Sequence, residues 1–79
     1  MNVGETKFFY ENPSISPIPG IPFIILEKTL DGAIVGKYTA YFNPRTLTYR
    51  LIPFFTKYAW YNDRLHKQTI SVDLVRRYK

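Results

Sequence analysis

The chain contains no cysteine and only one histidine, His66. Disulfides are therefore excluded, and the lack of cysteine fits a reducing compartment. A zinc site is disfavoured as well, because His66 has no thiolate and no second imidazole with which to share a metal ion. We expect a fold that needs no cross-link, no metal and no cofactor.

Long apolar segments are also lacking. The longest apolar run covers residues 21–26, far short of the roughly 20 residues that a membrane-spanning helix needs. The first residues are polar and do not show the basic segment and apolar stretch of a secretory signal. We expect no membrane span and no secretion, with a location in the cytoplasm or in an intracellular or viral assembly.

Groupings of catalytic residues are scarce. A nucleophile needs a base within hydrogen-bond reach, but Ser14, Ser16 and Ser71 lie in a proline-rich segment or in the last expected strand. Asp63 and His66 are three residues apart and could touch on a helix, where such a pair more often forms a weak surface contact. The glycines are widely spaced and form no phosphate-binding loop. We therefore expect a non-enzymatic protein.

The small size of the chain favours a partner. With 79 residues there is room for one domain, and a chain of this length buries only about 60% of the surface that its unfolded form exposes. Aromatic residues make up 18% of the chain, so large rings must supply much of the core. Such rings also favour association, and we expect another protein or a second copy of the chain as partner.

Positive charge is concentrated in the second half of the chain. The net charge is +5, residues 1–49 cancel to zero, and the whole excess lies in residues 50–79. This asymmetry points to an acidic partner, which could be nucleic acid, an anionic membrane surface or an acidic protein face. A solvated face that aids solubility explains the charge equally well.

A proline-rich segment covers residues 12–22. Prolines and isoleucines alternate in it: Pro13, Pro17, Pro19 and Pro22 with Ile15, Ile18 and Ile21. Proline fixes φ and removes a donor, so this segment is neither helix nor central strand. We expect residues 1–22 to form an extended N-terminal arm, polyproline-like in part, whose isoleucines are buried on the domain itself or on a neighbour. Residues 7–10 could add a short strand.

Three strands are predicted after the arm. Residues 23–28, 35–42 and 47–54 are rich in β-branched and aromatic side chains. The dipeptide at residues 31–32 is Asp-Gly, a hairpin signal, and Asn-Pro-Arg-Thr at residues 43–46 suits a type I turn. The three strands should therefore form an antiparallel meander.

The two turns together set a register. Ile25 should lie opposite Tyr38, and Phe42 opposite Leu47. One face should then be apolar and bear Phe23, Ile25, Tyr38, Ala40, Phe42, Leu47, Tyr49 and Leu51. The other face should be mixed and bear Ile24, Leu26, Lys37, Thr39, Tyr41, Thr48, Arg50 and Ile52. This second face is either solvated, with some cover from the arm, or a ligand-binding surface.

After Pro53 the spacing of the apolar residues changes from that of a strand to that of a helix. Phe54, Tyr58, Tyr61 and Leu65 recur at helical spacing and predict a helix over residues 54–67, although such a density of rings also suits a strand. Residues 69–75 alternate and predict a further strand. The expected fold is a small α+β domain over residues 23–79: a three-stranded antiparallel meander, one helix packed on it and a C-terminal fourth strand, preceded by the arm.

The predicted helix has a second side, opposite the one that bears Phe54, Tyr58, Tyr61 and Leu65. This second side bears Lys57, Trp60, Arg64 and Lys67. An exposed indole ringed by cations is typical of protein-binding hot spots, and it can also grip phosphates and stack on a base. Trp60 packed under the proline-rich arm, with the lysine stems along it, is an equally good interpretation.

Two classes of function follow from these surfaces. The first is a protein-interaction or assembly module, such as an accessory subunit or small inhibitor, which binds through Lys57, Trp60, Arg64 and Lys67 and through Ile15, Ile18 and Ile21. The alternative is a nucleic-acid-binding domain that presents its sheet face. The residues expected to contact nucleic acid are Lys37, Thr39, Arg50, Arg76, Arg77 and Lys79.

Overall fold

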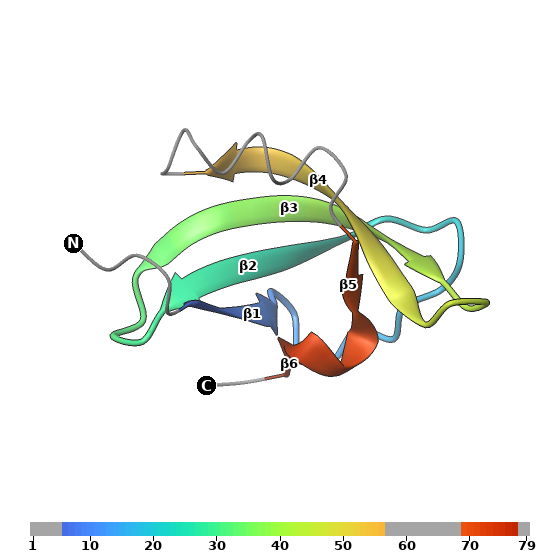
Figure 1. The fold of residues 1–79 in the computed structure, drawn as a ribbon, viewed down its shortest axis with the longest axis horizontal. Coiled ribbons are helices and arrows are strands. Elements are labelled where there is room, and N and C mark those ends of the chain that lie inside the picture. Colours follow the sequence, from blue (N-terminus) through green and yellow to red (C-terminus); the bar gives the residue numbers. More distant parts are fainter. Residues whose placement is uncertain (1–5, 57–68, 78–79) are drawn as a thin grey trace.

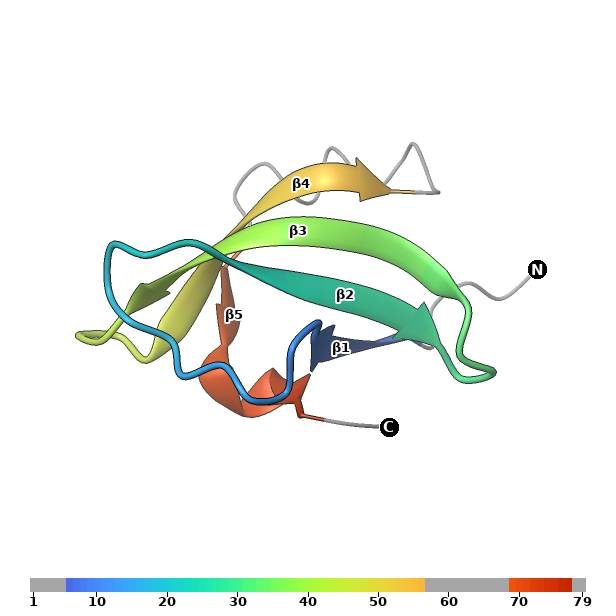
Figure 2. The same cartoon turned by 180° about the vertical axis from the view of Figure 1, so that it is seen from behind.

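The computed structural model describes residues 6–56 and 69–77, which form one curled sheet (Figures 1 and 2). Its strands are β1 (Thr6–Tyr10), β2 (Phe23–Thr29), β3 (Ile34–Asn43), β4 (Thr48–Thr56), β5 (Thr69–Ser71) and β6 (Val75–Arg76). Their order in the sheet is β5-β4-β3-β2-β1-β6. The strands at the two ends of this order are joined by a single 3-10 turn, Val72–Leu74. The sheet is therefore bent into a half-barrel, with its apolar face inside.

The predicted α+β fold is wrong, because the described residues contain no α-helix and form an almost all-β structure. Strand β4 continues to Thr56, across the predicted start of the helix at residue 54. A β-bulge explains the error: Tyr38 pairs with Pro53 and Lys37 with Phe55, which leaves Phe54 as an extra residue. This extra residue breaks the two-residue period by which a strand is recognised. The rest of the predicted helix, residues 57–67, lies outside the described residues.

The prediction that residues 1–22 form an extended arm outside the sheet is also partly wrong. Thr6–Tyr10 is a strand of the sheet, paired antiparallel with β2 and parallel with β6, so the short strand suggested at residues 7–10 is confirmed. Residues 11–22 are the connection from β1 to β2. The predicted C-terminal strand at residues 69–75 is interrupted, because Ser71 accepts a hydrogen bond from the Asp73 N–H at 3.3 Å and starts the 3-10 turn.

The meander of β2, β3 and β4 is confirmed, and the first hairpin has the predicted register. Ile25 pairs with Tyr38 and Phe23 with Ala40. The loop has one residue more than expected, since the Thr29 N–H donates to the Ala33 carbonyl at 2.9 Å. Gly32 has a φ of 93°, as the last residue of such a three-residue loop requires. A bulge between Glu27 and Lys28 then restores the register.

The second hairpin is shifted from its predicted register by two residues. Asn43 pairs with Thr48 and Phe42 with Tyr49, not with Leu47. A shift of two keeps every side chain on its face, so the predicted faces survive except at Leu47. That residue lies in the turn with a φ of 56° and is exposed.

Large rings fill the inner face, as expected from the composition. Tyr49 makes edge-on contacts with Phe23, Tyr10 and Phe42, with ring centroids 5.1, 6.0 and 5.7 Å away. Its hydroxyl is hydrogen-bonded to that of Tyr10. Burial, and then the bond to Tyr10, raise the pKa of Tyr49. Ile25, Tyr38, Ala40, Leu51, Ile70 and Val75 complete this core.

A buried carboxylate lies at one end of the inner face. The Glu27 side chain is 0% exposed, the Tyr38 hydroxyl donates to its Oε1 at 2.6 Å, and the Thr6 hydroxyl donates to its Oε2. Gly36 is paired with Glu27 across the strands. A Cβ on Gly36 would lie only 2.7 Å from the Tyr38 hydroxyl oxygen.

Arg77 ties the end of the described chain to the β1–β2 connection. Its Nη1 donates to the carbonyls of Pro13 and Ile15 at 2.9 and 2.8 Å, and its guanidinium lies 4.6 Å from the centroid of the Tyr10 ring. Ile15 packs against the core. Part of the proline-rich segment is therefore bound to the domain itself.

Candidate functional site

The outer face of the sheet, on the side away from the core, has the chemistry of a binding surface. Side chains alternate along each strand, so those between the core positions point to this face. We call it the outer face; its residues are Lys7, Phe9, Ile24, Leu26, Lys28, Lys37, Thr39, Tyr41, Thr48, Arg50, Ile52 and Arg76, joined by Phe54 and Phe55 at the bulge. Because the sheet is curled around its core, this face is convex (Figures 1 and 2).

One row of paired residues crosses the outer face from edge to edge. Arg76 is in register with Phe9, Phe9 with Leu26, Leu26 with Lys37, and Lys37 with Phe55. Neighbouring strands are about 4.8 Å apart, so residues next to each other in this row are close enough for a single ligand to touch. The row therefore alternates cations with rings and an aliphatic side chain.

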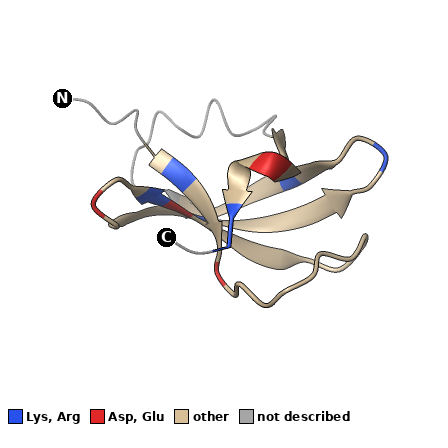
Figure 3. Ribbon diagram, turned by 90° about the horizontal axis from the view of Figure 1, so that it is seen from below, with Lys and Arg blue, Asp and Glu red and all other residues tan. Residues whose placement is uncertain are grey.

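Positive charge dominates this face. Its cations are Lys7, Lys28, Lys37, Arg50 and Arg76. Among the described residues, the one ion pair is between Lys37 and Glu11, with 3.8 Å between Nζ and Oε2 and both side chains well solvated. Such an exposed pair contributes little, about 0–1 kcal/mol. Most acidic segments lie in the connections between strands (Figure 3), so the outer face attracts anions.

Rings lie beside these cations. The Lys28 ammonium is 5.2 Å from the Phe9 ring centroid, that of Lys37 is 5.5 Å from the Phe54 centroid, and the Arg50 guanidinium is 5.4 Å from the Tyr41 centroid. Phe54 is 73% exposed and Phe55 42%. Large rings this open to solvent are costly unless something covers them.

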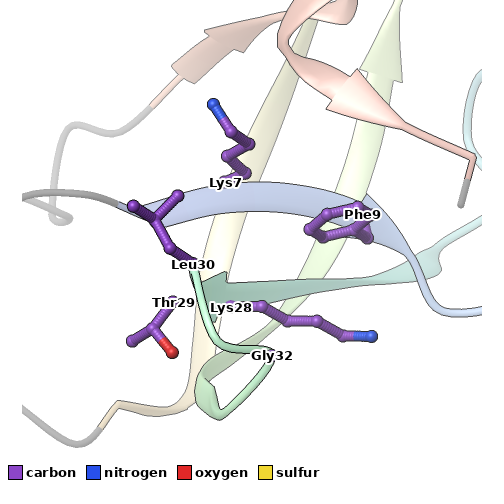
Figure 4. Close-up of a pocket in the computed structure, with 6 residues that line it drawn as sticks. All are labelled: Lys7, Phe9, Lys28, Thr29, Leu30 and Gly32. Atoms are coloured by element: carbon purple, nitrogen blue, oxygen red, sulfur yellow. The ribbon is translucent and has the colours of Figure 1, made fainter. Parts of the chain in front are cut away.

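A pocket lies on the outer face where β1 meets the turn between β2 and β3 (Figure 4). Its volume is about 210 Å³, and it is lined by Lys7, Phe9, Lys28, Thr29, Leu30 and Gly32. The lysine ammoniums are the charged groups of the lining, and no carboxylate is among these residues.

The residues predicted to contact nucleic acid are partly brought together. Lys37, Thr39 and Arg50 share the outer face, and Arg76 joins them from β6. Arg77 is held by the two carbonyls and the Tyr10 ring described above. Lys79 lies outside the described residues.

The residues predicted to bind a protein are mostly not described. Lys57, Trp60, Arg64 and Lys67 all lie outside residues 6–56 and 69–77, so the basic aromatic helix face stays a prediction. The isoleucines of the proline-rich segment differ from one another. Ile15 packs on the core, whereas Ile18 and Ile21 are each 56% exposed.

Sequence reasoning missed the part of the outer face formed by β1 and by Lys28 at the end of β2. Lys7 and Phe9 alternate with inner residues on β1, and Lys28 is directly opposite Lys7 on β2. The alternation was visible in the sequence. What was missing was the pairing of β1 with β2, since the long proline-rich connection hides that two strands on either side of it are neighbours.

Within the described ranges, no three His, Cys, Asp or Glu side chains are grouped so that they could hold a metal ion, and no helix is long and apolar enough to cross a membrane. Comparison with protein-family models, with curated proteins and with solved structures gives no match. The function is therefore inferred from the chemistry of the outer face.

Proposed function

We propose that this protein is a non-enzymatic binding module whose outer face binds single-stranded nucleic acid. The observation that carries the proposal is the juxtaposition of cations with rings on one sheet face, where Phe54 and Phe55 are exposed. Among the described residues, Glu11 is the single carboxylate paired there. Proteins that bind single strands combine these same two elements, positive charge for the backbone and rings on which bases stack.

The convex shape of the face favours a single strand over a duplex. A helix or ribbon must enter a groove to read duplex DNA, whereas a flexible strand can follow a curved surface. The exposed faces of Phe54 and Phe55 can stack only on bases that are not already stacked in a duplex. Each such stack contributes about 1–3 kcal/mol, so these rings select for unpaired bases.

Removal of two outer-face cations tests the electrostatic part. The double substitution Lys37→Gln, Arg50→Gln is expected to weaken binding of a short fluorescein-labelled oligothymidine by about 10–100-fold at low salt. The slope of log affinity against log salt should become shallower by about 1.4, or 0.7 for each lost phosphate contact. Fluorescence anisotropy over a salt series measures both quantities.

Arg45→Gln is the matched control, because it removes a cation from the exposed turn between β3 and β4. It should leave the affinity nearly unchanged. Phe54→Ser should weaken binding with no change in the salt slope, since a ring releases no counterions. The proposal fails if wild-type protein does not bind the oligothymidine at low salt, or if Arg45→Gln is as harmful as the double substitution.

A second candidate function, self-association through the proline-rich connection, has support from Ile18 and Ile21. Both are 56% exposed in a segment that Arg77 holds against the domain, and fixed apolar groups lose little entropy on binding. Sedimentation velocity of the wild type should then show a dimer that grows with concentration. The variant Ile18→Ser, Ile21→Ser should be monomeric; a wild type that is monomeric throughout would remove this candidate.

A further inference from the structure

The pocket at the β2–β3 turn has walls that differ in chemistry. Phe9 and Leu30 supply apolar surface, while Lys7 and Lys28 extend from neighbouring strands in different directions (Figure 4). Leu30 is 68% exposed at the tip of the turn. A ligand that fits must therefore have an apolar body and a negative group.

The two lysines give the electrostatic argument. Lys7 and Lys28 are directly paired across β1 and β2, and like charges at such positions repel each other. Asp31, in the turn beside the pocket, accepts hydrogen bonds from the Thr29 hydroxyl and the Ala33 N–H. Glu27, next to Lys28 in the sequence, is buried on the inner face, and Asp73 lines a second pocket with Lys7. An anion bound beside both ammoniums would turn this repulsion into attraction.

The apolar floor gives the second argument. The Lys28 ammonium lies 5.2 Å from the Phe9 ring centroid. A cation over a ring at a partly exposed site is held only weakly, so Lys28 can swing from the ring toward an anion. The Phe9 side chain is only 8% exposed, with Lys28 over its ring, so a flat ligand can reach this ring only where Lys28 moves away. The Leu30 side chain is already open to solvent.

We propose that this pocket binds one nucleotide unit, with its base against Phe9 and Leu30 and its phosphate between Lys7 and Lys28. The inference rests on the proposed function and deepens it, because Phe9 also belongs to the row that crosses the sheet from Arg76 to Phe55. A strand that follows this row reaches the pocket at β1. The volume of about 210 Å³ is below the roughly 300–1,000 Å³ of sites for drug-sized ligands, so it suits a single nucleotide.

The test uses the full chain and three probes: thymidine 5′-monophosphate, thymidine and inorganic phosphate. In a ¹H–¹⁵N NMR titration, the monophosphate should shift the amide signals of Lys7, Phe9, Lys28, Leu30 and Gly32. Thymidine and phosphate alone should bind at least about tenfold more weakly, because each supplies only one of the two contacts, and a charged hydrogen bond alone is worth a factor of about ten or more.

Two pocket variants and a control separate binding from folding. Lys28→Gln and Leu30→Ser should each weaken the binding of thymidine 5′-monophosphate by about tenfold. Both side chains are solvent-accessible, so thermal unfolding should match the wild type. Arg45→Gln, which removes the same charge from the distant β3–β4 turn, should bind the monophosphate as the wild type does.

The outcomes distinguish this site from the proposed function. In one outcome, the oligothymidine binds and the Lys37→Gln, Arg50→Gln variant weakens this binding, but the monophosphate shifts no pocket signal and Lys28→Gln has no effect. The pocket assignment is then overturned and the proposed function stands. Pocket shifts without any oligothymidine binding would support the nucleotide site and overturn the proposed function. Shifts spread over all lysines, and equal for phosphate and monophosphate, would also overturn the pocket.

Discussion

Replacing Gly36 with alanine is expected to destabilise the protein by about 3 kcal/mol, since overpacking a core costs about 1–3 kcal/mol and loss of a hydrogen bond about 0.5–1.5 kcal/mol. The added Cβ would lie 2.7 Å from the Tyr38 hydroxyl oxygen and 3.0 Å from two ring carbons. The Tyr38 side chain cannot move away from this Cβ, because it is 0% exposed and packs in the core. Any movement also pulls its hydroxyl away from Glu27.

Urea unfolding of Gly36→Ala, Tyr38→Phe and the double variant measures this contact. Tyr38→Phe removes the closest atom, so the double variant should be more stable than the sum of the two single effects predicts. The other described glycine of the first hairpin is a useful contrast. Gly32→Ala meets nothing within 4 Å and should cost about 1 kcal/mol from its positive φ alone, with no rescue by Tyr38→Phe. Additive effects at Gly36 would contradict the clash.

Replacing Glu27 with alanine is expected to cost about 2–5 kcal/mol, because it removes the acceptor of two hydrogen bonds, from the buried Tyr38 hydroxyl and from the half-buried Thr6 hydroxyl. It also opens a cavity on the inner face. Glu27→Gln should cost less, since its amide oxygen still accepts one of these bonds. The carboxylate thus fixes three strands, β1, β2 and β3, to one another.

Glu11→Ala is the matched control for Glu27→Ala. Glu11 is solvated and its pair with Lys37 spans 3.8 Å, so its removal should cost about 0–1 kcal/mol. Thermal and urea unfolding of the three variants give the comparison. A cost for Glu27→Ala no larger than that for Glu11→Ala would show that the buried network does not stabilise the fold.

Local patterns predicted the meander well, because two turns and strict alternation act over a few residues. The core positions Phe23, Ile25, Tyr38 and Ala40 follow from alternation alone, and the loop that is one residue too long is compensated by a bulge. The register of the second hairpin was wrong by two, since Asn43 and its neighbours suit more than one turn length. Because of this error, only Leu47 was assigned to the wrong place: it lies in the turn and not on the inner face.

Features that depend on distant pairing were not predictable in the same way. The pairing of Phe8 with Val75 joins residues from the two ends of the chain, and no local pattern specifies it. Nothing in the sequence marks Glu27 as buried, because its partners come from β1 and β3. For the same reason, Lys7 and Lys28 were not seen to share the outer face with Lys37. The third strand was predicted over residues 47–54, but the bulge at Phe54 made the last residues of this strand look like the start of a helix.

The parallel pairing of β1 with β6, followed by the Arg77 contacts, has a consequence for synthesis of the protein on the ribosome. The β2–β4 meander needs only residues up to 56, whereas the outer edge of β1 is covered only after residues 75–77 have left the exit tunnel. Until then the nascent chain carries an open strand edge, which is a site for wrong pairing. The sheet is thus completed only when residues 75–77 have been made and can pair with β1.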